Sequence, residues 1–116
     1  MQGKRLDRVN QLIKEEVSML LQRELKDPRL GFVTVTDVET SKDLRSAKIF
    51  VSVLGNDAQW KASMTALDSA RGFVRNWLRQ HLELRVTPDL DFRPDHSLEH
   101  AARIQSLLKQ VRAPGS

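Results

Sequence analysis

Apolar residues recur every three or four positions in the first part of the chain, which is the spacing of one face of an α-helix. This spacing holds from about Lys4 to Leu25, and Asp27-Pro28 ends it because the residue before a proline disfavours helical geometry. The pattern predicts an amphipathic N-terminal helix with one face in a core. Its apolar positions are Leu6, Val9, Ile13, Val17, Leu20 and Leu21.

Two following segments have a period of two, as half-buried strands do. In residues 32–39, Val33 and Val35 alternate with threonines, and in residues 47–54 every second side chain from Ala47 onward is apolar. Only a short turn, Ser41-Lys42-Asp43, separates them. The two segments are therefore predicted to form an antiparallel hairpin.

Helical spacing returns at Asp57, the expected N-cap, and continues to about Leu82 with Gly72 between two halves. A glycine inside a helix costs roughly 1 kcal/mol relative to alanine. Gly72 is therefore either tolerated, placed where helices pack closely, or used for a kink. The apolar positions are Trp60, Met64, Leu67, Phe73, Val74, Trp77, Leu78 and Leu82.

A third strand is expected within residues 84–92, where Leu90-Asp91-Phe92 alternates and Pro94 ends the pattern. A last helix follows, with Asp95 or Ser97 as its cap. Its expected apolar side consists of Leu98, Ile104, Leu107, Leu108 and Val111.

The element order predicts an α+β domain with helices packed on one face of a small three-stranded sheet. The order is helix, strand, strand, helix–kink–helix, strand, helix, and the helical crossover predicts one parallel strand pair. Residues 1–112 are expected to form this single domain, and residues 113–116 to be frayed.

Composition excludes several classes of protein. The chain has 116 residues and no cysteine, which rules out disulfides and thiolate chemistry. The longest apolar runs span three residues, far short of a membrane helix or signal peptide, so a cytoplasmic protein is expected. No two of the five glycines lie close enough for a dinucleotide fingerprint or a P-loop.

Two candidate metal sites are weak. His96-Ser97-Leu98-Glu99-His100 matches the H-x-x-E-H zinc pattern, but no Asp, Glu or His follows to supply the third ligand that catalytic zinc needs. Asp89 and Asp91 share a strand face, where Arg93 would oppose a cation. We therefore predict no metal site and no cofactor.

Positive charge is concentrated in one segment of the chain. The formal net charge is +4, yet residues 69–87 contain four arginines against one glutamate. Arg71, Arg75 and Arg79 are spaced i, i+4, i+8 and form one stripe on a helix, and Arg75 has no acidic residue three or four positions away. Such a run is most often a solvated face, but it also suits a polyanion. Trp77 lies on a different face of this helix from the arginines, and we predict that it belongs to the core.

Several motifs in a fixed order resemble the bacterial ribosome-binding factor A family, from about Arg5 to Leu108. They are Glu24-Leu25-Lys26-Asp27-Pro28-Arg29, Val33-Thr34-Val35-Thr36-Asp37-Val38, Asp43-Leu44, Ala47 through Gly55, Ala70-Arg71-Gly72-Phe73-Val74-Arg75, Pro88-Asp89-Leu90-Asp91-Phe92 and Asp95. The resemblance implies a type II KH-like domain that lacks the usual GxxG loop. An Ala-x-Gly kink, here Ala70-Arg71-Gly72, takes the place of that loop.

The resemblance also implies a function. It indicates a non-enzymatic assembly factor that binds the immature small ribosomal subunit and its rRNA, assists late rRNA processing and supports growth in the cold. A monomer is expected when the protein is free. The expected RNA-binding residues are basic or lie at the kink: Arg71, Gly72, Arg75 and Arg79 first, then Arg85, Arg5, Arg8, Arg29, Lys42 and Arg45.

Three alternatives remain at this point. The first alternative to an assembly factor is a KH-like RNA- or DNA-binding module with no ribosomal role. The second is an H-x-x-E-H metalloenzyme, and the third is an interaction module whose first helix docks on a partner protein.

Overall fold

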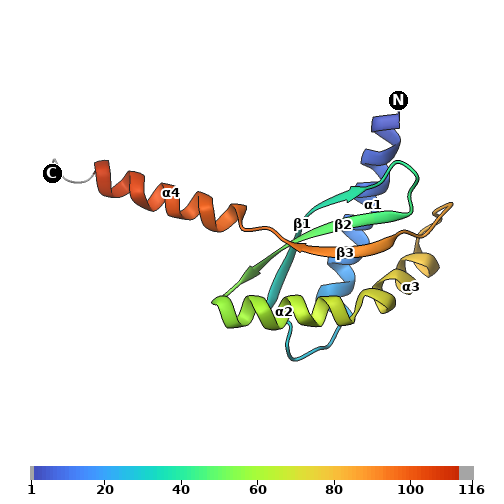
Figure 1. Cartoon of the computed structure of the whole chain (residues 1–116), viewed down its shortest axis with the longest axis horizontal. Coiled ribbons are helices and arrows are strands. Elements are labelled where there is room, and N and C mark those ends of the chain that lie inside the picture. Colours follow the sequence, from blue (N-terminus) through green and yellow to red (C-terminus); the bar gives the residue numbers. More distant parts are fainter. Residues whose placement is uncertain (1, 113–116) are drawn as a thin grey trace.

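The computed structural model describes residues 2–112 and has the predicted order of elements (Figure 1). The elements are α1 (Gln2–Arg23), β1 (Phe32–Thr40), β2 (Ser46–Leu54), α2 (Asp57–Ser69), α3 (Arg71–His81), β3 (Asp89–Pro94) and α4 (Ser97–Arg112). The α+β prediction is thus confirmed. The expectation that residues 113–116 are frayed lies outside the described residues.

The sheet has the order β1-β2-β3, with β2 in the middle. β1 pairs with β2 antiparallel and β2 pairs with β3 parallel, which confirms both pairing predictions. β3 begins at Asp89 rather than near Leu84, because the chain reaches the register of β2 only where Ser46 pairs with Asp89. Residues 82–88 therefore form a loop after α3.

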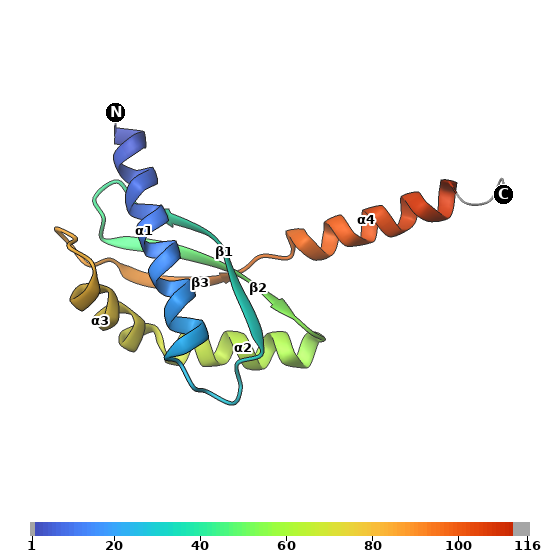
Figure 2. The ribbon, with the colours of Figure 1, turned by 180° about the vertical axis from the view of Figure 1, so that it is seen from behind.

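Helices α1, α2 and α3 cover one face of the sheet, so α1 passes behind the strands in Figure 1 and in front of them in Figure 2. The predicted helical stripe of α1 from Val9 to Leu21 and the predicted inner side of β2 both lie in the core, whereas Leu6, at the start of the stripe, lies outside it. The fully buried apolar residues between the layers include Ile13, Val17, Leu20, Ile49, Val51, Leu67, Val74 and Leu78.

β1 departs from strict alternation at Thr36. The register shifts between Val35 and Asp37, so Thr36 forms a β-bulge and both Val35 and Val38 are buried. Without the extra residue, Asp37 would face the core. The bulge leaves the Thr36 hydroxyl free to donate a 2.6 Å hydrogen bond to Oδ2 of Asp95, just after β3.

Asp95 fixes the start of α4. Its Oδ1 accepts a 2.9 Å hydrogen bond from the backbone N–H of Ser97, the first residue of α4. The N-cap position itself is His96, whose carbonyl oxygen accepts the first helical hydrogen bond, so neither of the two predicted caps occupies it. The Trp60 indole adds a second anchor, since its Nε1–H donates to Oε1 of Glu99 at 2.8 Å.

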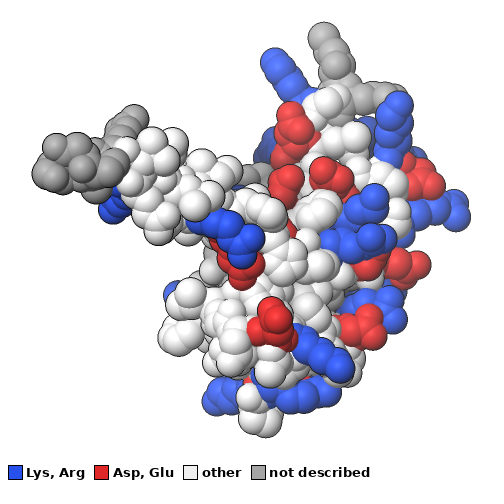
Figure 3. All heavy atoms as spheres, turned by 60° about the vertical axis from the view of Figure 1, so that its left-hand side comes forward, with Lys and Arg blue, Asp and Glu red and all other residues white. Residues whose placement is uncertain are grey.

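Beyond this first turn, α4 extends away from the body (Figure 1). Its predicted apolar side is about half exposed or more, and Figure 3 shows the projecting helix with few charged side chains. The prediction that the helices pack on one face of the sheet therefore holds for α1, α2 and α3 but not for α4. α1, α2 and α3 already cover the inner face of the sheet, and the anchors at Asp95 and Glu99 direct α4 elsewhere.

The break between α2 and α3 lies at Ala70. Ala70 is both the C-cap of α2 and the N-cap of α3, with φ −89° and ψ 0°. Gly72 is the second residue of α3, lacks a positive φ, and has no atom within 4 Å of where a Cβ would stand. Of the two residues predicted for the kink, Ala70 therefore lies at the break, whereas at Gly72 the structure shows neither an unusual backbone nor a close helix contact.

Gly55 is the glycine whose conformation matters. Its φ is 155°, and an added Cβ would overlap the Gln59 side chain. That side chain belongs to a capping box with Asn56, which caps α2 in place of the predicted Asp57.

Two alanine substitutions should shift stability in opposite directions. Gly72→Ala should be neutral or stabilise by up to about 1 kcal/mol, because Ala is the better helix former and meets no neighbour. Gly55→Ala should destabilise by more than about 1 kcal/mol, because it strains the backbone and displaces a capping group. The denaturant midpoints of both variants, compared with that of wild type, measure these changes in stability. A lower midpoint for Gly72→Ala would contradict the structure.

The Asp95 carboxylate should make stability depend on pH. The hydrogen bond from Thr36, followed by that from the Ser97 backbone, holds the pKa of Asp95 below its usual value. Its stabilising effect should therefore be complete above the unfolded-chain pKa of about 3.9 and lost as the pH falls through the lower folded value. The unfolding free energy of wild type minus that of Asp95→Asn should shrink below about pH 4. A difference independent of pH would count against these bonds.

Candidate nucleic-acid interface

Two of the three arginines of the predicted stripe on α3 are paired with acids. The Arg71 Nε lies 3.1 Å from Oδ1 of Asp68, one turn earlier. Arg79 instead donates a 2.8 Å hydrogen bond to the side-chain oxygen of Asn76. Both side chains lie on the exposed surface.

Arg75 joins α3 to β3. Its Nη2 donates to the carbonyl oxygen of Thr87 at 3.0 Å, and its Nε lies 3.1 Å from Oδ1 of Asp89. The sequence indicated that Arg75 lacks an acidic neighbour, which holds along the helix but not in space. Arg75 therefore has a structural role besides any binding role.

Three adjoining hollows run along the end of the domain where β2 and β3 begin. One is lined by Asp68, Ser69, Arg71, Gly72, Arg75, Asp89 and Leu90. The next is lined by Arg45, Arg75, Val86, Thr87 and Asp89. The third is lined by Arg5, Leu6, Lys42, Asp43, Leu44, Arg85 and Val86. Because neighbouring hollows share residues, we call this continuous surface the basic track.

Charge is not balanced evenly along the basic track. Six cationic side chains line it against three aspartates, and each aspartate is paired with an arginine: Asp68 with Arg71, Asp89 with Arg75, and Asp43 with Arg45. Within residues 2–112, the remaining cations have no ion-pair partner. They are Arg5, Lys42 and Arg85, and all three line the third hollow.

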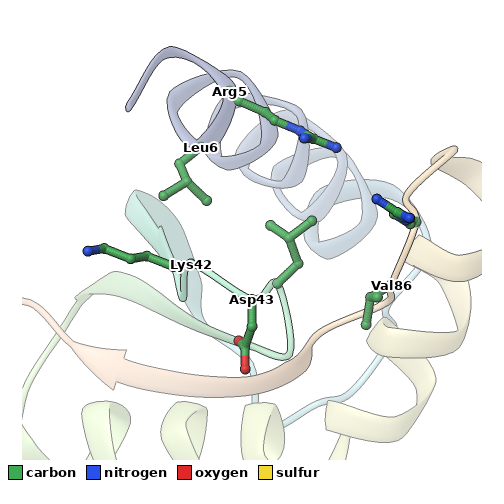
Figure 4. Close-up of a pocket in the computed structure, with 7 residues that line it drawn as sticks. Arg5, Leu6, Lys42, Asp43 and Val86 are labelled. Carbon is green, nitrogen blue, oxygen red and sulfur yellow. The ribbon is translucent and has the colours of Figure 1, made fainter. Parts of the chain in front are cut away.

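Three separate segments build this third hollow (Figure 4). Arg5 and Leu6 come from the start of α1, Lys42 from the β1–β2 turn, and Val86 from the α3–β3 loop. The two loops are joined where the Asp89 N–H donates to the Arg45 carbonyl oxygen at 2.9 Å. Parallel pairing of β2 and β3 thus brings basic residues together that lie 80 positions apart.

Hydrogen bonds fix the β1–β2 turn. Oδ1 of Asp43 accepts from the Ser41 hydroxyl at 2.7 Å and from the Arg45 N–H at 3.1 Å. The Ser41 hydroxyl, and then the Arg45 N–H, hold the pKa of Asp43 below its usual value. Figure 4 shows the Asp43 carboxylate pointing away from α1, and therefore away from Arg5 and Leu6.

The structure brings most, but not all, of the predicted RNA-binding residues together. Arg5, Lys42, Arg45, Arg71, Gly72, Arg75 and Arg85 line the basic track. Arg8, Arg29 and Arg79 do not line these three hollows. Arg29 lies before β1, where its guanidinium pairs with Asp27 at 2.8 Å. Sequence reasoning missed Leu6, Leu44 and Val86, whose apolar character gave no sign of a binding surface.

The other motifs have structural contacts. In the H-x-x-E-H segment, the His96 ring packs against Trp60 with an interplanar angle of 34°, and its Nδ1 lies 3.2 Å from Glu99. Trp77 is partly buried, and its Nε1–H donates to Glu16 of α1 at 2.9 Å. In residues 2–112, no group of three His, Asp or Glu side chains is placed to hold a metal ion. None of the helices in that range is long and apolar enough to cross a membrane.

The fold and the basic track define a small α+β protein with a surface suited to polyanions. The family model for ribosome-binding factor A matches residues 5–108. Ribosome-binding factor A of Halothermothrix orenii is 47% identical over 112 residues, which cover 97% of this chain and 92% of that protein. The corresponding protein of Brevibacillus brevis is 46% identical over 111 residues, covering 96% and 92%. The chain belongs to the ribosome-binding factor A family.

Solved structures agree with this assignment. The crystal structure of ribosome-binding factor A from Thermus thermophilus matches with a TM-score of 0.69 and 26% identity, covering 77% of this chain and 94% of that one. The solution structure of a Thermotoga maritima protein described as a putative ribosome-binding factor A has the same TM-score at 37% identity, covering 77% and 85%. A Thermus thermophilus homology model fitted into the electron microscopy map of a 30S–RbfA complex matches with a TM-score of 0.63 and 27% identity, covering 74% and 90%.

Arg75 and Arg79 should respond differently to charge reversal. Arg75→Glu should destabilise the fold by roughly 1–2 kcal/mol, because it breaks the Thr87 bond and places a carboxylate beside Asp89. Arg79→Glu should change stability by less than about 0.5 kcal/mol, since its contact is local and exposed. Thermal unfolding of both variants checks this, and equal effects would contradict the role of Arg75.

Proposed function

We propose that this protein is a ribosome assembly factor that binds the immature small ribosomal subunit through its rRNA. The observation that carries the proposal is the convergence of Arg5, Lys42 and Arg85, unpaired within residues 2–112, on one end of a ribosome-binding factor A fold. Such cations release the counterions that are condensed on RNA phosphates, which favours binding to RNA. The 30S complex of the Thermus thermophilus relative supports the choice of the small subunit.

The start of α3 adds to this surface. The first N–H groups of a helix lack partners within the helix and favour phosphate. Gly72 lies there with open space in place of a side chain, so an RNA backbone can approach closely. This gives Gly72 a role in access rather than in bending the chain. We infer from the resemblance to type II KH-like domains that the helix–helix junction at Ala70 faces nucleic acid.

The proposed mechanism is binding alone. A rigid basic surface that binds one arrangement of immature rRNA better than others shifts the subunit toward that arrangement. No reaction is needed for this, so we propose a non-enzymatic, cytoplasmic protein that is monomeric when free. Its loss should slow late rRNA processing most at low temperature, where RNA rearranges slowly.

A KH-like nucleic-acid-binding module with no ribosomal role is the second candidate. The basic track alone suits any phosphodiester chain. Cosedimentation separates the two candidates, because only an assembly factor should travel with small subunits in preference to free RNA.

Charge reversal at the third hollow should weaken small-subunit binding. The double variant Arg5→Glu/Lys42→Glu should bind at least tenfold more weakly, and the remaining binding should depend less steeply on salt, because fewer phosphate contacts remain. Sedimentation with immature small subunits at several salt concentrations measures both quantities.

The matched control is Lys26→Glu/Lys61→Glu. It makes the same change in net charge at exposed positions after α1 and in α2, and neither residue lines the basic track. The control should bind almost as wild type does. Equal losses in the two variants would mean that only net charge matters and would overturn the assignment of the surface.

A further inference from the structure

The third hollow of the basic track is not only cationic. It is a pocket of about 300 Å³ whose lining includes three apolar side chains, Leu6, Leu44 and Val86, beside its three cations. This volume lies at the small end of ligand-binding pockets. Hydrogen-bond donors and cations are sufficient to bind a phosphate. The apolar wall therefore indicates that the ligand also has an apolar group.

Leu44 has a backbone conformation that leucine rarely adopts. Its φ is 63°, and it is the one non-glycine residue with a positive φ within residues 2–112. That region favours Gly, Asn or Asp and costs other residues on the order of 1–3 kcal/mol. The surrounding turn holds this conformation, since the Leu44 N–H donates to the Ser41 carbonyl oxygen at 2.9 Å. The turn would form more readily with Asn or Gly, so turn geometry does not explain a leucine.

The pocket lining does explain it. Leu44 and Val86 come from different loops and line the pocket together with Leu6 of α1. Val86 is 39% exposed although it is apolar. Figure 4 shows Leu6 pointing from α1 toward the β1–β2 turn, with Arg5 and Lys42 extending to opposite sides. Apolar walls are thus flanked by charges on both sides.

We propose that this pocket binds one unstacked nucleobase of single-stranded RNA, with the adjacent phosphates on Arg5, Lys42 and Arg85. An unstacked base offers flat apolar faces, and arginine guanidinium planes stack on such faces. Proteins recognise RNA mainly at single-stranded segments, whose bases are free to leave the stack. The inference rests on the proposed function and adds the part of the RNA that the site recognises.

The first test replaces Leu44 by Asn, which tolerates the same backbone conformation but removes the apolar wall. Leu44→Asn should unfold no more easily than wild type. It should bind a single-stranded RNA 12-mer roughly five- to twentyfold more weakly, and a duplex of the same composition with less than a twofold change. Fluorescence anisotropy with the two labelled RNAs measures both affinities.

Two further variants keep this test decisive. Val86→Asn removes another wall of the same pocket and should reproduce the loss if Leu44→Asn does not fold. Leu54→Asn removes an exposed leucine that does not line this pocket, and should bind both RNAs as wild type does. If the Leu44 and Val86 variants bind single strands normally, or lose single strand and duplex equally, the nucleobase assignment is wrong.

An NMR titration distinguishes binding of the nucleobase from binding of the phosphate. Adding uridine or adenosine monophosphate should shift the methyl NMR signals of Leu6, Leu44 and Val86, whereas inorganic phosphate and ribose 5-phosphate should shift them much less. Equal shifts from all of these would make the pocket a phosphate site only and overturn the proposal. If the wild type cosediments with small subunits but Leu44→Asn binds normally, only the pocket assignment fails. If the wild type binds neither subunits nor RNA, the proposed function fails with it.

Discussion

The parallel pairing of β2 with β3 is the constraint on which the binding surface depends. Ser46 pairs with Asp89, so both strands begin at the same end of the sheet. The loop before each strand must therefore lie at that end, beside the first turns of α1. The helical pair α2–α3 makes this pairing possible, because a parallel strand can be reached only by a crossover. Arg5, Lys42 and Arg85 meet as a consequence of topology rather than of sequence proximity.

Periodicity was sufficient to predict every helix and strand, because burial on one side leaves a repeat that the sequence carries directly. The three- and four-residue spacing of Ile13, Val17 and Leu20 is an example, and all three are fully buried. The bulge at Thr36 was missed although Val35 and Val38 lie three positions apart, which does not fit a period of two. The destination of α4 was also missed, since an apolar stripe shows that a helix can be buried but not what covers it.

The candidate site was predictable in its residue types more than in its arrangement. Counting charges along α3 drew attention to Arg71, Arg75 and Arg79, and that count includes only neighbours on the same helix. Asp89 lies fourteen positions from Arg75 in the chain but 3.1 Å away in space. Of the cations on the basic track that have no ion-pair partner in residues 2–112, Arg85 belongs to the positive segment 69–87, whereas Arg5 and Lys42 lie far from it in the sequence. No local pattern therefore marked the three as one group. The positive φ of Leu44 was likewise invisible, because nothing in a leucine indicates that conformation.

The central claim is that the basic track faces the ribosomal subunit while the opposite end of the domain stays in solvent. Lysine acetylation of the protein, free and in complex with immature small subunits, tests this most directly, with each modified lysine identified by mass spectrometry. Lys42 lines the track, whereas Lys26 and Lys61 are exposed and do not. Lys42 should be protected in the complex while Lys26 and Lys61 react as they do in the free protein. Protection of Lys26 and Lys61 with Lys42 still reactive would contradict the account.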